Sequence, residues 1–154
     1  GVWMEYGLNT VITNNIIDAD NYGIIANYGS YYSLNGNTIR LYNLQESYDE
    51  RGIEFYSSEY CTINNNHITS STHASYARGI YNNSGNSQAI INGNTIEVGL
   101  SSWDTTQCNF YTSSGSSYSL YYPIGIDVED PSEIKSNTIS GILLLKYAES
   151  KRYL

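Results

Sequence analysis

The sequence predicts an all-β solenoid, a fold in which one small supersecondary unit is stacked many times along an axis. Two observations predict it: a hexapeptide pattern that recurs five times, and a glycine followed by a β-branched aliphatic residue that precedes each copy. The hexapeptide reads aliphatic, two residues, asparagine, one residue, isoleucine, and its copies span residues 12–17, 34–39, 63–68, 91–96 and 134–139. Intervals of 22 to 43 residues between the copies are typical of a repeated unit whose loops vary in length.

The glycine-aliphatic pairs mark the first strand of each unit. They are Gly1-Val2, Gly23-Ile24, Gly52-Ile53, Gly79-Ile80 and Gly125-Ile126. Around them the hydrophobic period is two, which indicates strands whose alternate side chains point inward. The expected inward pairs are Val2 and Met4, Ile24 and Ala26, Ile53 and Phe55, and Ile126 and Val128, whereas Asn82 breaks the pattern beside Ile80. Each repeat is therefore expected to contain two anchored strands.

Stacked parallel coils place equivalent residues in columns about 4.8 Å apart. The residue immediately before the hexapeptide asparagine is, in successive coils, Asn14, Gly36, Asn65, Gly93 and Ser136. These residue types tolerate a left-handed backbone, so this column predicts a turn. The asparagines of the pattern, Asn15, Asn37, Asn66, Asn94 and Asn137, are expected to form a ladder in which each amide donates to the next coil. At about 1 kcal/mol net per bond, the ladder serves architecture and register rather than catalysis.

With these pairs and asparagines in phase, the sequence resembles the right-handed parallel β-helix proteins that have the pectin-lyase-like fold. Segments such as Asn94-Thr95-Ile96 and Asn137-Thr138-Ile139 carry the resemblance, which covers almost the whole chain. It implies a right-handed parallel β-helix of five to six coils. The same fold hosts lyases, hydrolases, epimerases, adhesins, carbohydrate-binding modules and passive surface proteins, so the resemblance does not fix a function.

Composition limits the functional classes. The 154 residues form one solenoid domain, residues 1–154, with a long loop insertion at about 97–123 that is a candidate partner surface. A net charge of −8 without a basic cluster excludes nucleic-acid binding, and no apolar run is long enough for a transmembrane segment.

Residue 1 is already the glycine of the first coil, so the chain is expected to be a processed product or an excised piece. Its first coil is then expected to be capped by preceding residues or by another subunit.

Candidate chemistry gathers on the outward face of the strands that follow each glycine. Asp127 and Glu129 share that face, and Asp130 lies nearby, so these carboxylates are candidates for calcium binding or for an acid/base pair. Glu54 lies in the column of Asp127, two rungs or roughly 10 Å away, and Tyr81 lies between them. The segment 130–133 is similar to the Asp-Pro-His-Glu motif of alginate epimerases, but serine replaces the histidine, and an incidental acidic turn is the alternative interpretation.

Other candidate sites are isolated. Arg51 and Arg78 are expected one rung apart, so a carboxylate such as Glu50, or a bound anion, must separate their charges. Cys61 is expected to point inward as a buried thiol, with a disulfide to Cys108 as the alternative, worth roughly 4 kcal/mol. Asn82 begins an Asn-x-Ser sequon, a possible glycosylation site. His67 is expected on an outward face, and with His73 in a loop it makes a poor metal site; no cofactor is expected.

The leading functional hypothesis is a non-catalytic extracellular β-solenoid, a structural or adhesive piece of the cell surface that stacks end to end with other subunits. The absence of a visible cap, the 14% of charged residues and the Tyr- and Asn-rich surface favour it, and the composition resembles that of archaeal surface-layer and sheath proteins with β-helix repeats. The expected partners are copies of the chain or neighbouring surface proteins. The alternative is a polysaccharide-acting enzyme or carbohydrate-binding module that uses Asp127, Glu129, Tyr81 and Glu54.

Overall fold

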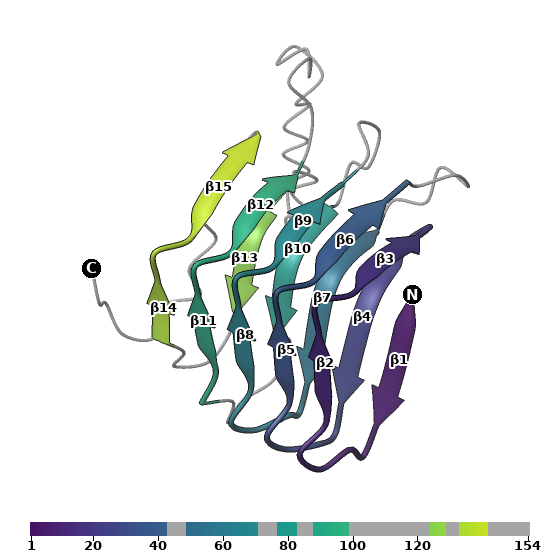
Figure 1. Cartoon of the computed structure of the whole chain (residues 1–154), viewed down its shortest axis with the longest axis vertical. Helices are drawn as coiled ribbons and strands as arrows, with labels where there is room; N and C mark the ends of the chain where they lie inside the picture. The colour runs from purple at the N-terminus through teal and green to yellow at the C-terminus, as the bar shows by residue number, and fades with distance from the viewer. Residues whose placement is uncertain (43–48, 71–76, 83–87, 99–123, 129–132, 142–154) are drawn as a thin grey trace, which may run out of the picture.

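The computed structural model shows a right-handed parallel β-helix. It describes residues 1–42, 49–70, 77–82, 88–98, 124–128 and 133–141. Five coils of three strands each are described, and corresponding strands of successive coils pair in parallel to form three sheets (Figure 1). Right-handedness is the expected hand for crossovers between parallel strands of one sheet.

Each sheet takes one strand from every coil. The first sheet contains β1 (Val2–Glu5), β4 (Tyr22–Asn27), β7 (Glu50–Tyr56), β10 (Ala77–Asn82) and β13 (Ile124–Val128). The second contains β2 (Val11–Thr13), β5 (Ser33–Asn35), β8 (Thr62–Asn64), β11 (Ile90–Asn92) and β14 (Glu133–Lys135). The third contains β3 (Ile16–Ala19), β6 (Thr38–Leu41), β9 (His67–Thr69), β12 (Thr95–Val98) and β15 (Thr138–Gly141).

The repeat contains three strands rather than the two expected from the sequence. Both ends of the hexapeptide are extended, and the asparagine turn divides it into two short strands such as β2 and β3. The residue before the asparagine has positive φ in every described coil, between 52° at Ser136 and 66° at Gly36, which confirms the predicted turn. A left-handed residue bends the chain sharply within two residues, so one sequence pattern spans a corner between two sheets.

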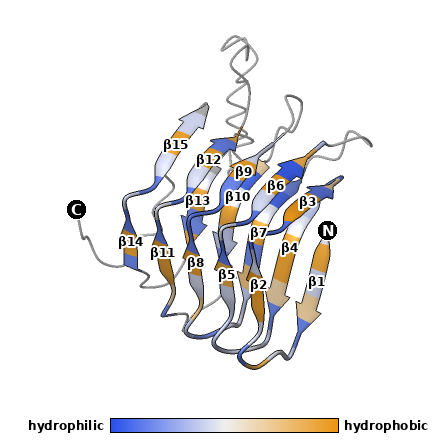
Figure 2. Cartoon of the chain, viewed as in Figure 1, coloured by the Kyte–Doolittle hydropathy of each residue, from blue (hydrophilic) through white to orange (hydrophobic). Residues whose placement is uncertain are grey.

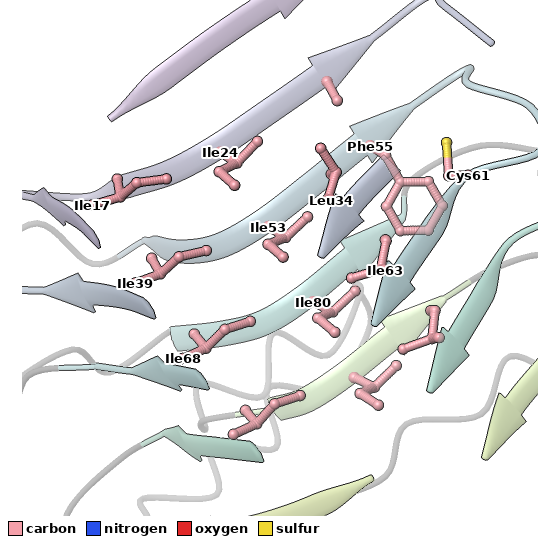
Figure 3. Packing of buried hydrophobic residues seen from close by; sticks show 14 of the residues in the cluster. Ile17, Ile24, Leu34, Ile39, Ile53, Phe55, Cys61, Ile63, Ile68 and Ile80 are labelled. Atoms are coloured by element: carbon pink, nitrogen blue, oxygen red, sulfur yellow. The ribbon is translucent and has the colours of Figure 1, made fainter. Parts of the chain in front are cut away.

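The core consists of aliphatic columns that run parallel to the solenoid axis. Ile24, Ile53 and Ile80 lie above one another, and Ile39 and Ile68 form part of a neighbouring column (Figure 3). All five side chains are fully buried. The predicted inward side chains of the middle coils are confirmed, whereas Val2, Met4 and Val128 are only partly buried because they belong to the first and last described coils. At about 25 cal/mol per Å² of buried apolar surface, these columns are the main source of stability.

The pattern asparagines form a continuous ladder at the corner between the second and third sheets. The Nδ2 group of each asparagine from Asn15 to Asn94 donates to Oδ1 of the asparagine in the next coil, at 2.9–3.2 Å. The backbone N–H of the same residue donates to that Oδ1 atom as well. The ladder is therefore directional: every rung donates toward the C-terminal end and accepts from the N-terminal end.

Candidate functional site

Two arginines lie side by side on the outer face of the first sheet. Arg51 on β7 pairs in register with Arg78 on β10, as the sequence predicts. Their charges are separated by Asp49, whose carboxylate lies 2.6 Å from Nη2 of Arg51 and 3.8 Å from Nη1 of Arg78. Glu50, the expected counter-charge, is completely buried, and its role beside the arginines stays a prediction. The alternation of side chains breaks within β7, because Arg51 and Glu54, three residues apart, form an ion pair with each other.

Each of the two predicted acidic residues described here has an arginine partner. Oε2 of Glu54 lies 2.7 Å from Nη1 of Arg51, and Oδ2 of Asp127 lies 3.2 Å from Nε of Arg78. Tyr81 lies between the two acids in the same column, as expected, and both guanidinium groups lie over its ring at 4.0 and 4.8 Å from the centroid. These contacts tie β7, β10 and β13 together across their outer face.

The cluster is shielded from solvent although it lies on an outward face. Glu54, Tyr81 and Asp127 are each exposed by less than a tenth. Burial lowers the pKa of Arg51, but the hydrogen bonds with Asp49 and Glu54 outweigh it and raise the pKa above its usual range. With three carboxylates and two guanidinium groups among these residues, the charges nearly balance, which is the condition for keeping ionised groups in a poorly solvated site.

This pairing does not favour acid/base catalysis by Glu54 and Asp127. A general acid or base must reach the substrate proton at hydrogen-bond distance, and here one oxygen of each carboxylate already lies in an ion pair with an arginine. Glu129, the other predicted acid, and Asp130, which with Asp127 and Glu129 makes the predicted calcium set, lie outside the described residues. The insertion at about 97–123 lies almost entirely outside them as well.

Metal-binding side chains do not gather within the described part of the chain. No group of three or more His, Cys, Asp or Glu residues there is arranged to hold a metal ion. His67 is half exposed on the third sheet, with Nε2 3.4 Å from the carboxylate of Glu97, and His73 lies outside the described residues.

Cys61 is buried at the corner between the first and second sheets and has no disulfide partner among the described residues. Burial raises its pKa to about 12, and since the thiolate is the reactive form, the native protein should protect it. The predicted partner Cys108 lies outside the described residues, so the disulfide stays a prediction.

We expect Cys61 to be unreactive in the folded protein. In a Cys108→Ser variant, Ellman's reagent at pH 8 should label no thiol until denaturant is added, when one thiol should appear, because unfolding returns the pKa toward about 8.5. Rapid labelling of the native variant would contradict the burial. Non-reducing mass spectrometry of the parent chain tests the disulfide separately.

Glycosylation at Asn82 stays a prediction, because the rest of the sequon lies outside the described residues. The Asn82 side chain occupies the inward position after Ile80 on β10 and is completely buried. An N-linked glycan needs an amide that reaches solvent, so this burial weighs against the prediction. The polar residue that breaks the inward pattern is thus part of the interior.

A second surface feature is a set of tyrosines at the corner between the first and second sheets, which we term the tyrosine ridge: Tyr6, Tyr28, Tyr31, Tyr56 and Tyr60. The rings of Tyr6 and Tyr28 stack at 5.3 Å, Tyr56 meets Tyr28 edge to face at 5.2 Å, and Tyr31 stacks on Tyr60 at 5.1 Å. The sequence analysis noted the many tyrosines but missed the ridge. The sequence signal that could have revealed the ridge is the position of its tyrosines, because Tyr31 and Tyr60 each lie three residues before a hexapeptide.

Comparisons with known proteins give one result. A family model described as Periplasmic copper-binding protein (NosD) matches residues 1–122. Among curated proteins and among solved structures, none matches the chain. Among the described residues, no helix has the length and apolar character needed to cross a membrane.

Proposed function

Because the chain belongs to the NosD family, described as periplasmic copper-binding proteins, we propose that it works outside the cytoplasm as a non-catalytic β-solenoid scaffold. Its coils stack end to end with those of further copies, in a filament, sheath or surface layer. The observation that carries this proposal is the direction of the asparagine ladder, which gives the two ends of the solenoid opposite hydrogen-bonding character.

The ends of the described ladder are complementary. Asn15 donates to Oδ1 of Asn37, so in the same pattern a coil placed before Asn15 would donate to Oδ1 of Asn15. Nδ2 of Asn137 donates to the carbonyl of Ile91, and in the preceding rungs the second N–H of Nδ2 donates to the following coil. A head-to-tail contact between two copies would extend the ladder by one rung. Such a heterologous contact does not close on itself and generates open filaments.

The first described coil suits a further coil stacked on it. Its inward side chains, including Val2, Met4 and Ile12, are only partly buried, in contrast to their counterparts in the middle coils. Among the described strands, β1, β2 and β3 are the outermost of the three sheets and carry many hydrophobic residues (Figure 2). The last coil of another copy would pair with these strands and cover the partly buried side chains.

The copper in the family description does not enter this proposal. No described cluster of ligands fits the metal, and the buried thiol of Cys61 has a pKa raised to about 12, which disfavours the thiolate that would bind it. The polysaccharide-acting enzyme is not favoured either, since Glu54 and Asp127 are paired with arginines. Turnover of a uronic-acid polymer to unsaturated products, abolished by Asp127→Asn, would contradict the scaffold proposal.

Sedimentation tests the stacking through a matched pair of substitutions. The parent chain should form species larger than a monomer as its concentration rises, and more so with added salt, which screens the net charge of −8. Ile12→Lys places an ammonium group on the first described coil, where the last coil of another copy would stack, and should keep the chain monomeric. Ile16→Lys adds the same charge four residues away on a side chain that is 71% exposed, and should leave assembly nearly unchanged.

Two outcomes would refute end-to-end stacking. The first is a parent chain that remains monomeric at every concentration and salt level. The second is equal assembly by Ile12→Lys and the parent, provided that circular dichroism shows both to be folded. Electron micrographs of the assembled parent should show filaments whose long axis follows the solenoid axis.

A further inference from the structure

We infer that the tyrosine ridge is a binding surface for a neutral, hydroxyl-rich linear polysaccharide that lies along the solenoid axis. This surface is separate from the first and last described coils, on which the stacking proposal depends. Five features of the ridge support the inference: the repetition of its rings from coil to coil, its exposure, the backbone conformation that displays it, the support beneath it, and the charges beside it.

The ridge repeats in part at the spacing of the coils. Tyr6 stacks on Tyr28 at 5.3 Å and Tyr31 stacks on Tyr60 at 5.1 Å, each pair joining successive coils, and Tyr56 from the neighbouring column meets Tyr28 edge to face at 5.2 Å. Tyr6, Tyr28, Tyr31 and Tyr60 are all exposed, by 42% to 74%. A polymer with a short chemical repeat matches such a row, whereas the surface of a globular protein does not repeat.

The backbone of the ridge is costly for tyrosine. Tyr6, Tyr28, Tyr31 and Tyr60 have φ between 53° and 57°, the left-handed region that an ordinary side chain enters at about 1–2 kcal/mol. Asn9 occupies the same column as Tyr31 with φ of 54°, so the same turn forms with a residue that tolerates it better. Unfavourable backbone conformations persist where function requires the side chain. Tyrosine at these positions is therefore better explained by binding than by folding.

The ridge stands on a rigid corner. Tyr32 is buried beneath it, and its hydroxyl accepts the backbone N–H of Gly7 at 2.9 Å. The buried Ser58 donates to the carbonyl of Ala26 at 2.8 Å, and the backbone N–H of Tyr28 donates to the carbonyl of Tyr56. Side chains held on such a support lose little further entropy on binding.

Charge selects the class of polymer. The exposed acidic residues Glu5 and Glu59 lie on the same corner, and the whole chain carries −8, so a polyanion is repelled. The described ridge contains no cationic side chain. Tyrosine supplies rigid amphipathic area and one hydroxyl per ring, which suits the alternating apolar faces and hydroxyl groups of a neutral sugar chain.

Native gel electrophoresis through gels containing a soluble polymer tests the inference. Hydroxyethyl cellulose should retard the parent chain, and polygalacturonate should not. Tyr28→Asn combined with Tyr31→Asn should weaken the retardation at least tenfold while leaving the melting temperature nearly unchanged or higher, because asparagine relieves the left-handed strain. Tyr42→Ala is the matched control: Tyr42 is as exposed as Tyr28 but lies after β6, on the opposite corner of the coil.

Three results would overturn the inference. They are the absence of retardation by the neutral polymer, equal retardation of the double variant, and retardation by polygalacturonate alone. Sedimentation of the double variant separates this surface from the stacking ends, since loss of self-assembly with polymer binding retained would make the ridge a protein contact. Failure of the Ile12→Lys test leaves the ridge inference standing.

Discussion

Asn66→Ala should destabilise the protein by about 3 kcal/mol or more, because it removes the central rung of the ladder. The Oδ1 atom of Asn66 accepts the N–H and Nδ2 groups of Asn37 at 2.9 and 3.0 Å, and its Nδ2 donates to Leu34 and Asn94 at 2.7 and 3.0 Å. A ladder bond contributes only about 1 kcal/mol net, but each buried partner left unsatisfied costs about 1–3 kcal/mol. Urea unfolding followed by circular dichroism measures the difference.

Asn92→Ala is the control for the ladder. Asn92 lies in the next coil, two residues before Asn94, and its side chain is exposed. Its loss should change the free energy of unfolding by less than about 0.5 kcal/mol, as is usual at the surface. Equal effects of Asn66→Ala and Asn92→Ala would show that the ladder does not hold the coils together.

Gly79→Ala should be comparably damaging, for a steric reason. A Cβ atom at Gly79 would lie 2.5 Å from the carbonyl oxygen of Gly125 and would collide with the Cγ2 methyl of Ile96. One obstacle is backbone in the adjacent coil and the other is a fully buried core side chain, so neither can move away cheaply. Overpacking of this kind costs typically 1–3 kcal/mol, and a backbone clash places Gly79→Ala at or above about 3 kcal/mol. Thermal and urea unfolding should both show the loss.

Gly93→Asn provides the contrast within the same coil. Gly93 has φ of 65°, and asparagine already occupies the equivalent turn position at Asn65, with φ of 54°. The new Cβ would meet only the movable side-chain oxygen of Asn65. We expect a change of about 1 kcal/mol or less. If Gly93→Asn were as harmful as Gly79→Ala, this would contradict the claim that Gly79 is required by close packing and Gly93 only by its backbone conformation.

Much of the fold could be predicted from sequence because each coil imposes the same local requirements. A left-handed residue must precede every ladder asparagine, and the sequence supplies Asn, Gly or Ser there, as the φ values confirm. The inward positions of Ile24, Ile53 and Phe55 followed from their alternation, and the register of Arg51 with Arg78 followed from their equal distance to the glycine pairs. Repetition makes such inferences strong, since one pattern is tested several times in one chain.

The site was harder to predict, because the pairing of side chains depends on local backbone geometry as well as on which residues share a column. Glu50 is buried and Arg51 is paired with both Asp49 and Glu54, an arrangement that simple alternation does not predict. Alternation did place Asn82 inward, but it could not show that the amide is completely buried. The third strand was missed because a three-residue strand such as β8 is too short for a periodic signal.

Disulfide trapping between the two ends tests most directly whether the solenoid continues from one copy to the next. Thr13 and Lys135 lie in one column, four rungs or about 19 Å apart within a molecule, but one rung or about 4.8 Å apart across a head-to-tail contact. In a Cys108→Ser background, Thr13→Cys with Lys135→Cys should yield a ladder of covalent multimers after mild oxidation, since a disulfide needs Cα atoms within about 7 Å. Thr13→Cys with Asn64→Cys should yield none. Monomers alone from the first pair, or equal multimers from both, would contradict the account.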